Sequence, residues 1–206
     1  NIFNPALVGR AILFVSWGSY MGGNIWPAPK LFEFSADIAA VTAATPLANQ
    51  GEALKVTLSQ LVTGNVAGCL GETSALAISL GAFWLFSKKH IDWRIPGGYL
   101  GTVFVMGILF GGGFYHGYLA TGLFHLLAGG VLFGALVMAT DMVTSPVTPN
   151  GKLVFGVGCG LITMIVRLFG TFPEGVTFAI LIMNALTPLI DNFTVPKAFG
   201  EVKRGA

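Results

Sequence analysis

Long apolar stretches alternate with short polar turns along most of this 206-residue chain. Residues 95–140 contain no Asp, Glu, Lys or Arg, and these 46 residues are enough for two membrane spans of about 20 residues each. Further apolar stretches flank this pair, so that six spans are expected, at about residues 3–21, 66–86, two within 95–140, 153–170 and 175–190. The pattern therefore predicts an all-α integral membrane protein, a polytopic helical bundle.

Composition strengthens this prediction. Hydrophobic residues make up 54% of the chain and charged residues only 10%, whereas a soluble domain has about 25% charged residues. The lipid bilayer is thus the expected surroundings, and a net charge of +2 gives no reason to expect a nucleic-acid partner. We expect residues 1–206 to form a single membrane domain.

The basic residues indicate how the bundle is oriented. If the turn at residues 88–94 is cytoplasmic, seven Lys and Arg residues fall on the cytoplasmic side, and only Lys30 and Lys55 fall on the opposite side. Cytoplasmic loops of membrane proteins carry an excess of Lys and Arg. The loop at residues 22–62 is therefore predicted to face outward.

Thr45 in this loop is the main candidate for chemistry. It lies in a run of small residues, from Asp37 to Ala48, and it precedes Pro46. Proline disfavours the helical region for the residue before it, so Thr45 is expected to be extended, with a hydroxyl that a modifying enzyme can reach. In the alternative interpretation, Thr45 and Pro46 only open a short helix, as N-cap and first helical residue.

Three charged residues lie within apolar stretches. Arg10, Glu72 and Arg167 each cost about 2.5 to 3.5 kcal/mol at a bilayer centre, so they are expected to face protein or a polar path. An ion or cofactor site and a structural role, as an ion pair or as Arg reaching the headgroups, both fit. The glycine-rich run from Gly68 to Gly71 before Glu72 also fits a broken or re-entrant helix.

The remaining reactive residues show no metal-binding pattern. His116 and His125 lack a second ligand at a suitable spacing, and we interpret them as packing residues. Cys69 and Cys159 lie in separate apolar stretches and are interpreted as small core residues. Glycine pairs four residues apart, such as Gly97 with Gly101 and Gly156 with Gly160, predict close helix packing.

Several motifs in order resemble one known family. They include Asn4-Pro-Ala-Leu-Val-Gly9-Arg10, Gly68-Cys-Leu-Gly-Glu-Thr-Ser-Ala-Leu-Ala77, Met138-Ala-Thr-Asp141, Gly170-Thr-Phe-Pro-Glu174-Gly175 and Met183-Asn184-Ala-Leu-Thr-Pro188. The chain resembles the family shared by the D subunits of Rnf electron-transport complexes and the B subunits of sodium-pumping NADH:quinone reductases. The run Thr144-Ser-Pro is more similar to the Rnf branch. This resemblance implies a urea-channel-like membrane fold and further helices before Asn1.

The resemblance also implies a cofactor. In this family FMN is attached through its phosphate to a threonine in a Ser/Thr-Gly-Ala-Thr motif, commonly followed by Pro-Leu. The matching residues here are Thr42, Ala43, Ala44 and Thr45, so that Thr45 is the expected site of the phosphoester. Ala43 departs from the usual glycine and loses only the freedom of positive φ. A second, non-covalent flavin is also compatible with the resemblance.

The implied function is that of a subunit, not of an enzyme acting alone. The resemblance implies a member of an ion-translocating ferredoxin:NAD oxidoreductase complex in a bacterial or archaeal cytoplasmic (inner) membrane, passing electrons between subunits as sodium or protons move. The implied partners are membrane subunits A and E, flavoprotein G and soluble subunits B and C. A passive channel or transporter, and a membrane scaffold without redox activity, are the alternatives.

Overall fold

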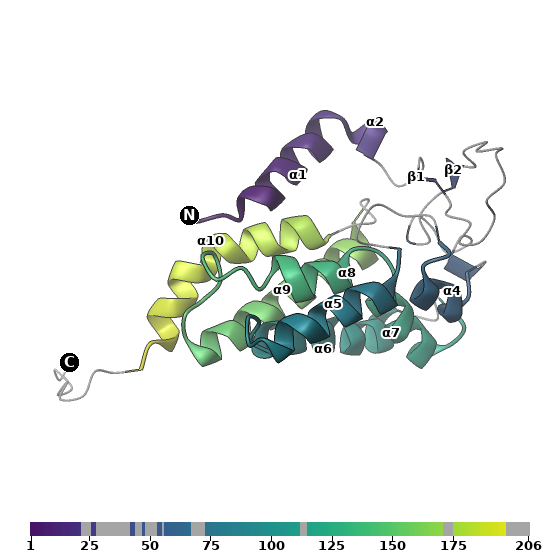
Figure 1. Cartoon of the computed structure of the whole chain (residues 1–206). Coiled ribbons are helices and arrows are strands. Elements are labelled where there is room, and N and C mark those ends of the chain that lie inside the picture. Colours follow the sequence, from purple (N-terminus) through teal and green to yellow (C-terminus); the bar gives the residue numbers. More distant parts are fainter. Residues whose placement is uncertain are drawn as a thin grey trace.

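The computed structural model describes residues 1–21, 26–27, 42–43, 47, 53–54, 56–66, 73–111, 115–170 and 175–196. Helices α6 and α9 pack side by side, α10 lies on α9, and α1 lies on α10 (Figure 1). The helices are α1 (Pro5–Ser16), α2 (Gly18–Met21), α4 (Leu58–Thr63), α5 (Ala75–Ser87), α6 (Arg94–Phe110), α7 (Tyr118–Leu127), α8 (Val131–Phe133), a π-helix (Gly134–Met138), α9 (Pro149–Phe169) and α10 (Val176–Thr194). The strands β1 (Trp26–Pro27) and β2 (Thr42–Ala43) form one short antiparallel pair.

The helical membrane fold is confirmed. Within the described ranges, α9 and α10 are long and apolar enough to cross a membrane, and the bent pair formed by α7 and α8 with the π-helix makes a third candidate. The expected spans at 3–21 and 66–86 contain shorter helices, because α1 ends at Ser16 and α5 begins only at Ala75. Helix α6 is also shorter than the 20 residues expected of a straight span.

Local sequence explains where several helices begin. The side chain of Asn4 accepts hydrogen bonds from the backbone amides of Ala6 and Leu7 and so caps α1. Thr148 caps α9 in the same way through Gly151, and Pro149 follows it at the first helical position. Caps of this kind satisfy amides that the helix itself leaves unpaired.

Glycines set the contact between α6 and α9. A Cβ on Gly156 would lie 2.5 Å from the carbonyl oxygen of Ile95, and one on Gly160 would lie 2.9 Å from that of Tyr99. The packing predicted for this pair is confirmed. For Gly97 and Gly101 the prediction is wrong, because Gly101 has open space around it, and Gly98 lies against the backbone of α9 instead.

The break between α7 and α8 bends the chain by 65°. Gly129 has a φ of +68°, a conformation that residues with a side chain rarely adopt, and Ala128 before it is extended. The structure thus contains a broken helix at residues 128–130, a position that the sequence analysis did not single out. The predicted break at 68–71 lies outside the described residues.

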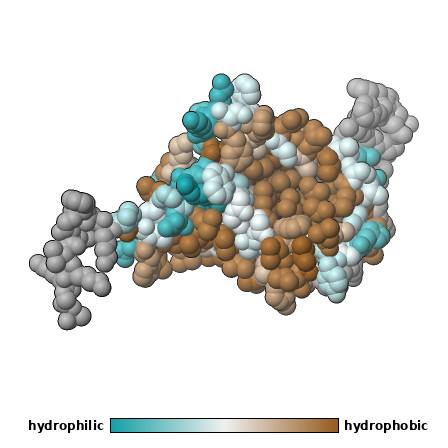
Figure 2. Space-filling view, turned by 90° about the horizontal axis from the view of Figure 1, so that it is seen from below, coloured by the Kyte–Doolittle hydropathy of each residue, from teal (hydrophilic) through white to brown (hydrophobic). Residues whose placement is uncertain are grey.

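Different segments of the chain meet at the two ends of the bundle. The turn between α5 and α6 lies beside the start of α9, where Lys152 contacts Asp92, whereas Tyr115 before α7 contacts Val56 before α4. β1, β2 and α4 lie at the latter end (Figure 1). Seen from below, the molecule presents a broad hydrophobic face with hydrophilic residues toward its edges (Figure 2). Exposed apolar side chains on α5 and α6, among them Leu80, Phe83 and Leu109, are typical of a surface that meets lipid or another membrane subunit.

Candidate functional site

Half of the predicted flavin motif lies within the described structure. Thr42 and Ala43 form β2, in which Ala43 lies opposite Trp26 and Thr42 opposite Pro27. Ala44 and Thr45 lie outside the described residues, as do Asp37, Glu72 and Cys69. The attachment of FMN to Thr45 therefore stays a prediction, and the site is built from the residues next to the motif.

Leu47, two positions after Thr45, packs at the break between α7 and α8. Its side chain is half-buried against a cluster formed by Ala53, Leu61, Val66, Tyr115, Phe124 and Ala128. A Cβ on Gly129 would lie only 2.5 Å from Leu47 Cδ1 and 3.2 Å from Arg167 Nη2. The absence of a side chain at Gly129 thus lets Leu47 and Arg167 approach the same turn of backbone.

Arg167 binds the end of α7 from the neighbouring helix α9. Its Nη1 donates to the carbonyl oxygen of His125 at 2.6 Å, and its Nη2 donates to that of Ala128 at 3.0 Å. The last carbonyls of a helix have no partner within it, and a guanidinium can bind two of them at once. Arg167 thus has a structural role at the break, through backbone carbonyls that the sequence did not identify as its partners.

Aromatic side chains connect this break to the segments that precede α4 and α7. The rings of Tyr115 and Phe124 stack at 5.0 Å, and that of His125 meets Phe124 edge-on at 5.8 Å. The hydroxyl of Tyr115 donates to the carbonyl oxygen of Val56, ahead of α4. The start of α4, the start of α7 and the helix break therefore form one packed region, which we call the break site: Leu47, Tyr115, Phe124, His125, Gly129 and Arg167.

The other charged and reactive residues of the sequence motifs lie at separate places in the fold. Asp141, between the π-helix and α9, accepts hydrogen bonds from its own loop, from the Val143 amide and the Thr144 hydroxyl. Arg10 lines a small cavity between α1 and α10 with Phe14 and Phe178. Cys159 is buried, His116 is exposed, and the described part of the chain holds no group of three His, Cys, Asp or Glu residues suited to a metal ion.

Asn184 in α10 is a buried polar residue that the sequence analysis did not identify as buried. Its side chain is 1% exposed, and neither its Oδ1 nor its Nδ2 has a hydrogen-bond partner among the described residues. Pro188 has no amide hydrogen to donate to the Asn184 carbonyl one turn earlier. Polar atoms therefore collect at this point of an otherwise apolar helix.

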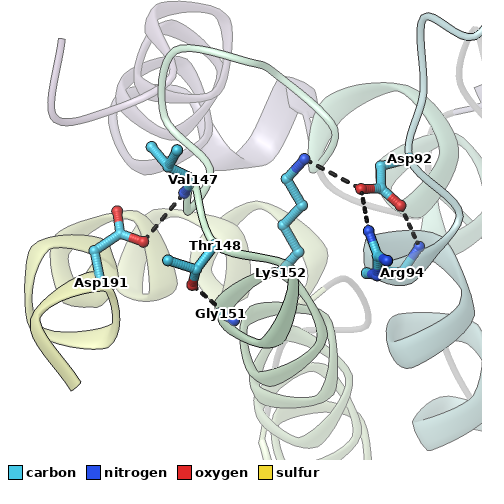
Figure 3. A network of polar contacts seen from close by, with 7 residues as sticks. All are labelled: Asp92, Arg94, Val147, Thr148, Gly151, Lys152 and Asp191. Atoms are coloured by element: carbon cyan, nitrogen blue, oxygen red, sulfur yellow. Dashed lines mark hydrogen bonds and ion pairs between the residues drawn. The ribbon is translucent and has the colours of Figure 1, made fainter. Parts of the chain in front are cut away.

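A second polar group, drawn in Figure 3, lies where the turn between α5 and α6 meets the start of α9. Asp92 accepts from Arg94 Nη1 at 3.0 Å and from Lys152 Nζ at 3.2 Å, which joins the start of α6 to the start of α9. Partial burial raises the pKa of Asp92, but hydrogen bonds from the Arg94 amide and from Lys152, with the charges of both residues, outweigh it. The pKa of Asp92 thus lies below its ordinary value of 3.8.

Sequence reasoning found Arg167 as a charge but missed its partners and the break. The available signal was the pair Gly129-Gly130 inside a stretch long enough for a span. The link between Asp92 and Lys152 had no comparable signal, because 60 residues separate them.

Comparisons with known proteins all indicate the same family. The profile of the NQR2, RnfD, RnfE family matches residues 1–200. The D subunit of the proton-translocating ferredoxin:NAD(+) oxidoreductase complex of Clostridium ljungdahlii is 43% identical, over 97% of this chain and 62% of that protein. Its counterpart from the Na(+)-translocating complex of Acetobacterium woodii is 42% identical, over 98% of this chain and 60% of that protein. The D subunit of the ion-translocating oxidoreductase complex of Stutzerimonas stutzeri is 38% identical, over the whole chain and 65% of that protein.

Proposed function

Because this chain belongs to the NQR2, RnfD, RnfE family, we propose that it is part of the D subunit of an ion-translocating ferredoxin:NAD oxidoreductase complex. The chain spans 60 to 65% of the length of the relatives compared above, so the activity proposed is that of the longer subunit within its complex. The family match over residues 1–200 is the observation on which this proposal depends.

The proposed cofactor is FMN on Thr45. The threonine hydroxyl attacks the activated phosphate of a flavin donor, with a flavin transferase as catalyst. The new bond joins Oγ1 to phosphorus, while the hydroxyl proton and the donor's leaving group depart. FMN, once bound, supplies the transfer of electrons between neighbouring redox centres.

The residues beside the motif fit such an attachment. Leu47 fixes the chain just after Thr45 against the break site, and β2 fixes Thr42 and Ala43 just before it. A tethered group needs a defined position more than a deep pocket, because the covalent bond already prevents its loss. The backbone around Leu47 is stabilised by two side chains. Arg167 donates to the carbonyls of His125 and Ala128, and the Tyr115 hydroxyl donates to that of Val56.

The proposal includes an orientation and leaves the coupling ion unassigned. We place the turn at residues 88–94 in the cytoplasm of a bacterial cell and the motif loop on the outer side of the inner membrane, following the distribution of Lys and Arg. Relatives named for protons and for Na(+) are 43% and 42% identical to this chain, so overall similarity does not distinguish the two ions.

Mass spectrometry of the full-length subunit, co-expressed with its complex and a flavin transferase, tests the attachment. We expect the peptide that contains Thr45 to gain the mass of FMN less one water. Thr45→Ala should abolish in-gel flavin fluorescence while the protein stays in the membrane, and Thr45→Ser, which keeps a hydroxyl, should retain part of it. Flavin fluorescence that persists in Thr45→Ala would contradict the assignment.

Two further variants serve as controls. Thr57 is exposed and is the N-cap residue before α4 in the same loop, so the Thr57→Ala protein should keep the flavin on Thr45. Ala43→Gly restores the usual motif and should not lower the yield of modification. A protein with no flavin, in cells whose transferase modifies a control substrate, would instead favour the channel or scaffold. Solute flux in liposomes would then separate these two alternatives.

A further inference from the structure

An open cavity of about 690 Å³ lies at the end of the bundle away from the break site. It is lined by the turn between α5 and α6, the start of α9 and residues 140–147 (the segment before α9). Asp92, Arg94 and Lys152, drawn in Figure 3, form its polar wall. We call it the basic cavity, and neither the flavin proposal nor the family match assigns it a role.

The charge of the basic cavity favours an anion. Among the described residues that line it, Lys89, Arg94 and Lys152 are basic and one residue, Asp92, is acidic. A lysine ammonium has three donors, and Asp92 occupies one of those on Lys152. The N-terminal ends of α6 and α9, with 17 and 21 residues, also lie here, and they add partial positive charge.

Nearby acids do not cancel this charge within the cavity. Asp141 binds the Val143 amide and the Thr144 hydroxyl of its own loop, and Asp191 accepts from the Val147 amide (Figure 3). Neither of them lines the cavity, whose walls thus have a net excess of positive charge.

The backbone at Lys89 supports a role for its side chain. The amides of Lys89 and His90 donate to the carbonyls of Phe86 and Leu85, which is the Schellman pattern at the end of α5. Glycine is the usual residue at this position, yet Lys89 adopts a φ of +57°. Side chains held in the left-handed region are concentrated at functional sites.

The rim of the cavity is apolar and exposed. Trp93 is 65% exposed, Met142 74% and Val147 81%, although all three line the cavity. Phe83 and Trp84, near the end of α5 that leads into this turn, are also exposed. A soluble anion would bury none of this apolar surface, whereas the apolar part of an amphipathic molecule would cover it and gain binding free energy from its removal from water.

We propose that the basic cavity binds the phosphate headgroup of an anionic phospholipid, from the leaflet on that side of the membrane. The phosphate lies between Lys89, Arg94 and Lys152, and the acyl chains cover the apolar rim. Basic pockets at helix ends bind anionic headgroups through this combination of charge and apolar contact. The inference requires only the membrane bundle and is independent of the flavin on Thr45.

The test uses the full-length subunit in its complex, reconstituted in phosphatidylcholine bilayers with spin-labelled phosphatidylglycerol or spin-labelled phosphatidylcholine as probes. The measured quantity is the association constant of the anionic probe relative to the neutral one. Lys152→Gln and Lys89→Gly should each lower it about fivefold. Lys88→Gln removes the same charge at the same turn, but Lys88 packs over Trp84 and does not line the cavity, so its value should stay within about twofold.

Lys89→Gly keeps the test valid if Lys152→Gln fails to fold. Glycine relieves the left-handed backbone, so the melting temperature should rise while lipid selectivity falls. Equal losses in Lys88→Gln and Lys89→Gly would overturn the proposal, because they would indicate a diffuse surface charge. Inorganic phosphate that displaces the labelled lipid at millimolar concentration would assign the site to a soluble anion. Unchanged selectivity with loss of complex assembly would assign it to an acidic segment of a partner subunit.

Discussion

At the scale of single residues, two charged groups of this membrane protein, Arg167 and Asp92, are explained by the groups they bind. Arg167 lies in an apolar helix, yet it donates to two carbonyls at the end of α7. Asp92 lies in a turn and is bound by Arg94 and Lys152. Binding of this kind reduces the cost of a charge in a poorly solvated region.

A substitution that keeps the charge of Arg167 tests this account. Lysine cannot offer two rigid donors to the carbonyls of His125 and Ala128, so Arg167→Lys should lower the free energy of unfolding by about 2 kcal/mol. Helix content followed by circular dichroism, during titration with a denaturing detergent, gives the measurement. Arg94→Lys is the matched control, because its ion pair is partly exposed and should contribute less than about 1 kcal/mol. Equal effects would contradict the role of the two carbonyls.

At the scale of elements, glycines determine how closely the helices approach. Gly156 and Gly160 on α9 face the backbone of α6, and Gly107 on α6 faces Gly122 on α7. Helices in a membrane gain little from the hydrophobic effect when they meet, so close packing contributes more to their association.

Two alanine variants separate packing from helix propensity. A Cβ at Gly156 would lie 2.5 Å from the Ile95 carbonyl oxygen, so Gly156→Ala should cost about 1 to 3 kcal/mol in the free energy of unfolding. Gly101 has no heavy atom within 4 Å of such a Cβ, so Gly101→Ala should be neutral or stabilising by up to about 1 kcal/mol. Thermal unfolding of both variants in the same detergent provides the comparison. A loss of stability in Gly101→Ala as large as that in Gly156→Ala would contradict this packing.

At the scale of the whole molecule, the two ends of the bundle differ in chemistry. One end holds the basic cavity, and the other holds the break site and the motif strands. The broad hydrophobic face lies between them (Figure 2). If the distribution of basic residues sets orientation, the two ends lie on opposite sides of the membrane.

Cysteine labelling in intact cells tests this orientation. Cys69 and Cys159, together with any other cysteine of the full-length subunit, are first replaced by Ala, and a single Cys then replaces either Ser87, at the end of α5, or His116, before α7. Both positions are exposed. A membrane-impermeant maleimide added from outside should label His116→Cys, whereas Ser87→Cys should react only after the cells are permeabilised. The reverse pattern would place the motif loop in the cytoplasm.

The sequence by itself determined the class of fold and the family, because both depend on local composition and on motifs in order. Apolar runs and the family motifs, among them the four residues of the proposed flavin site, are all contained within short segments. Close packing of the helix that contains Gly156 and Gly160 was also predicted, from their spacing, but the sequence did not identify α6 as its partner. These features depend on covalent geometry and on the solubility of side chains in lipid, which do not require a partner far along the chain.

Only the tertiary structure decided which distant residues meet. It placed Leu47 and Arg167 at Gly129, joined Lys152 to Asp92, and gave the close contact with α9 to Gly98 in place of Gly97 and Gly101. The rotation of a helix about its axis depends on all the surfaces packed around it, and a shift of one residue turns a side chain by about 100°. The break at residues 128–130 also depends on a distant residue, since the carbonyls at the end of α7 accept hydrogen bonds from Arg167 of α9.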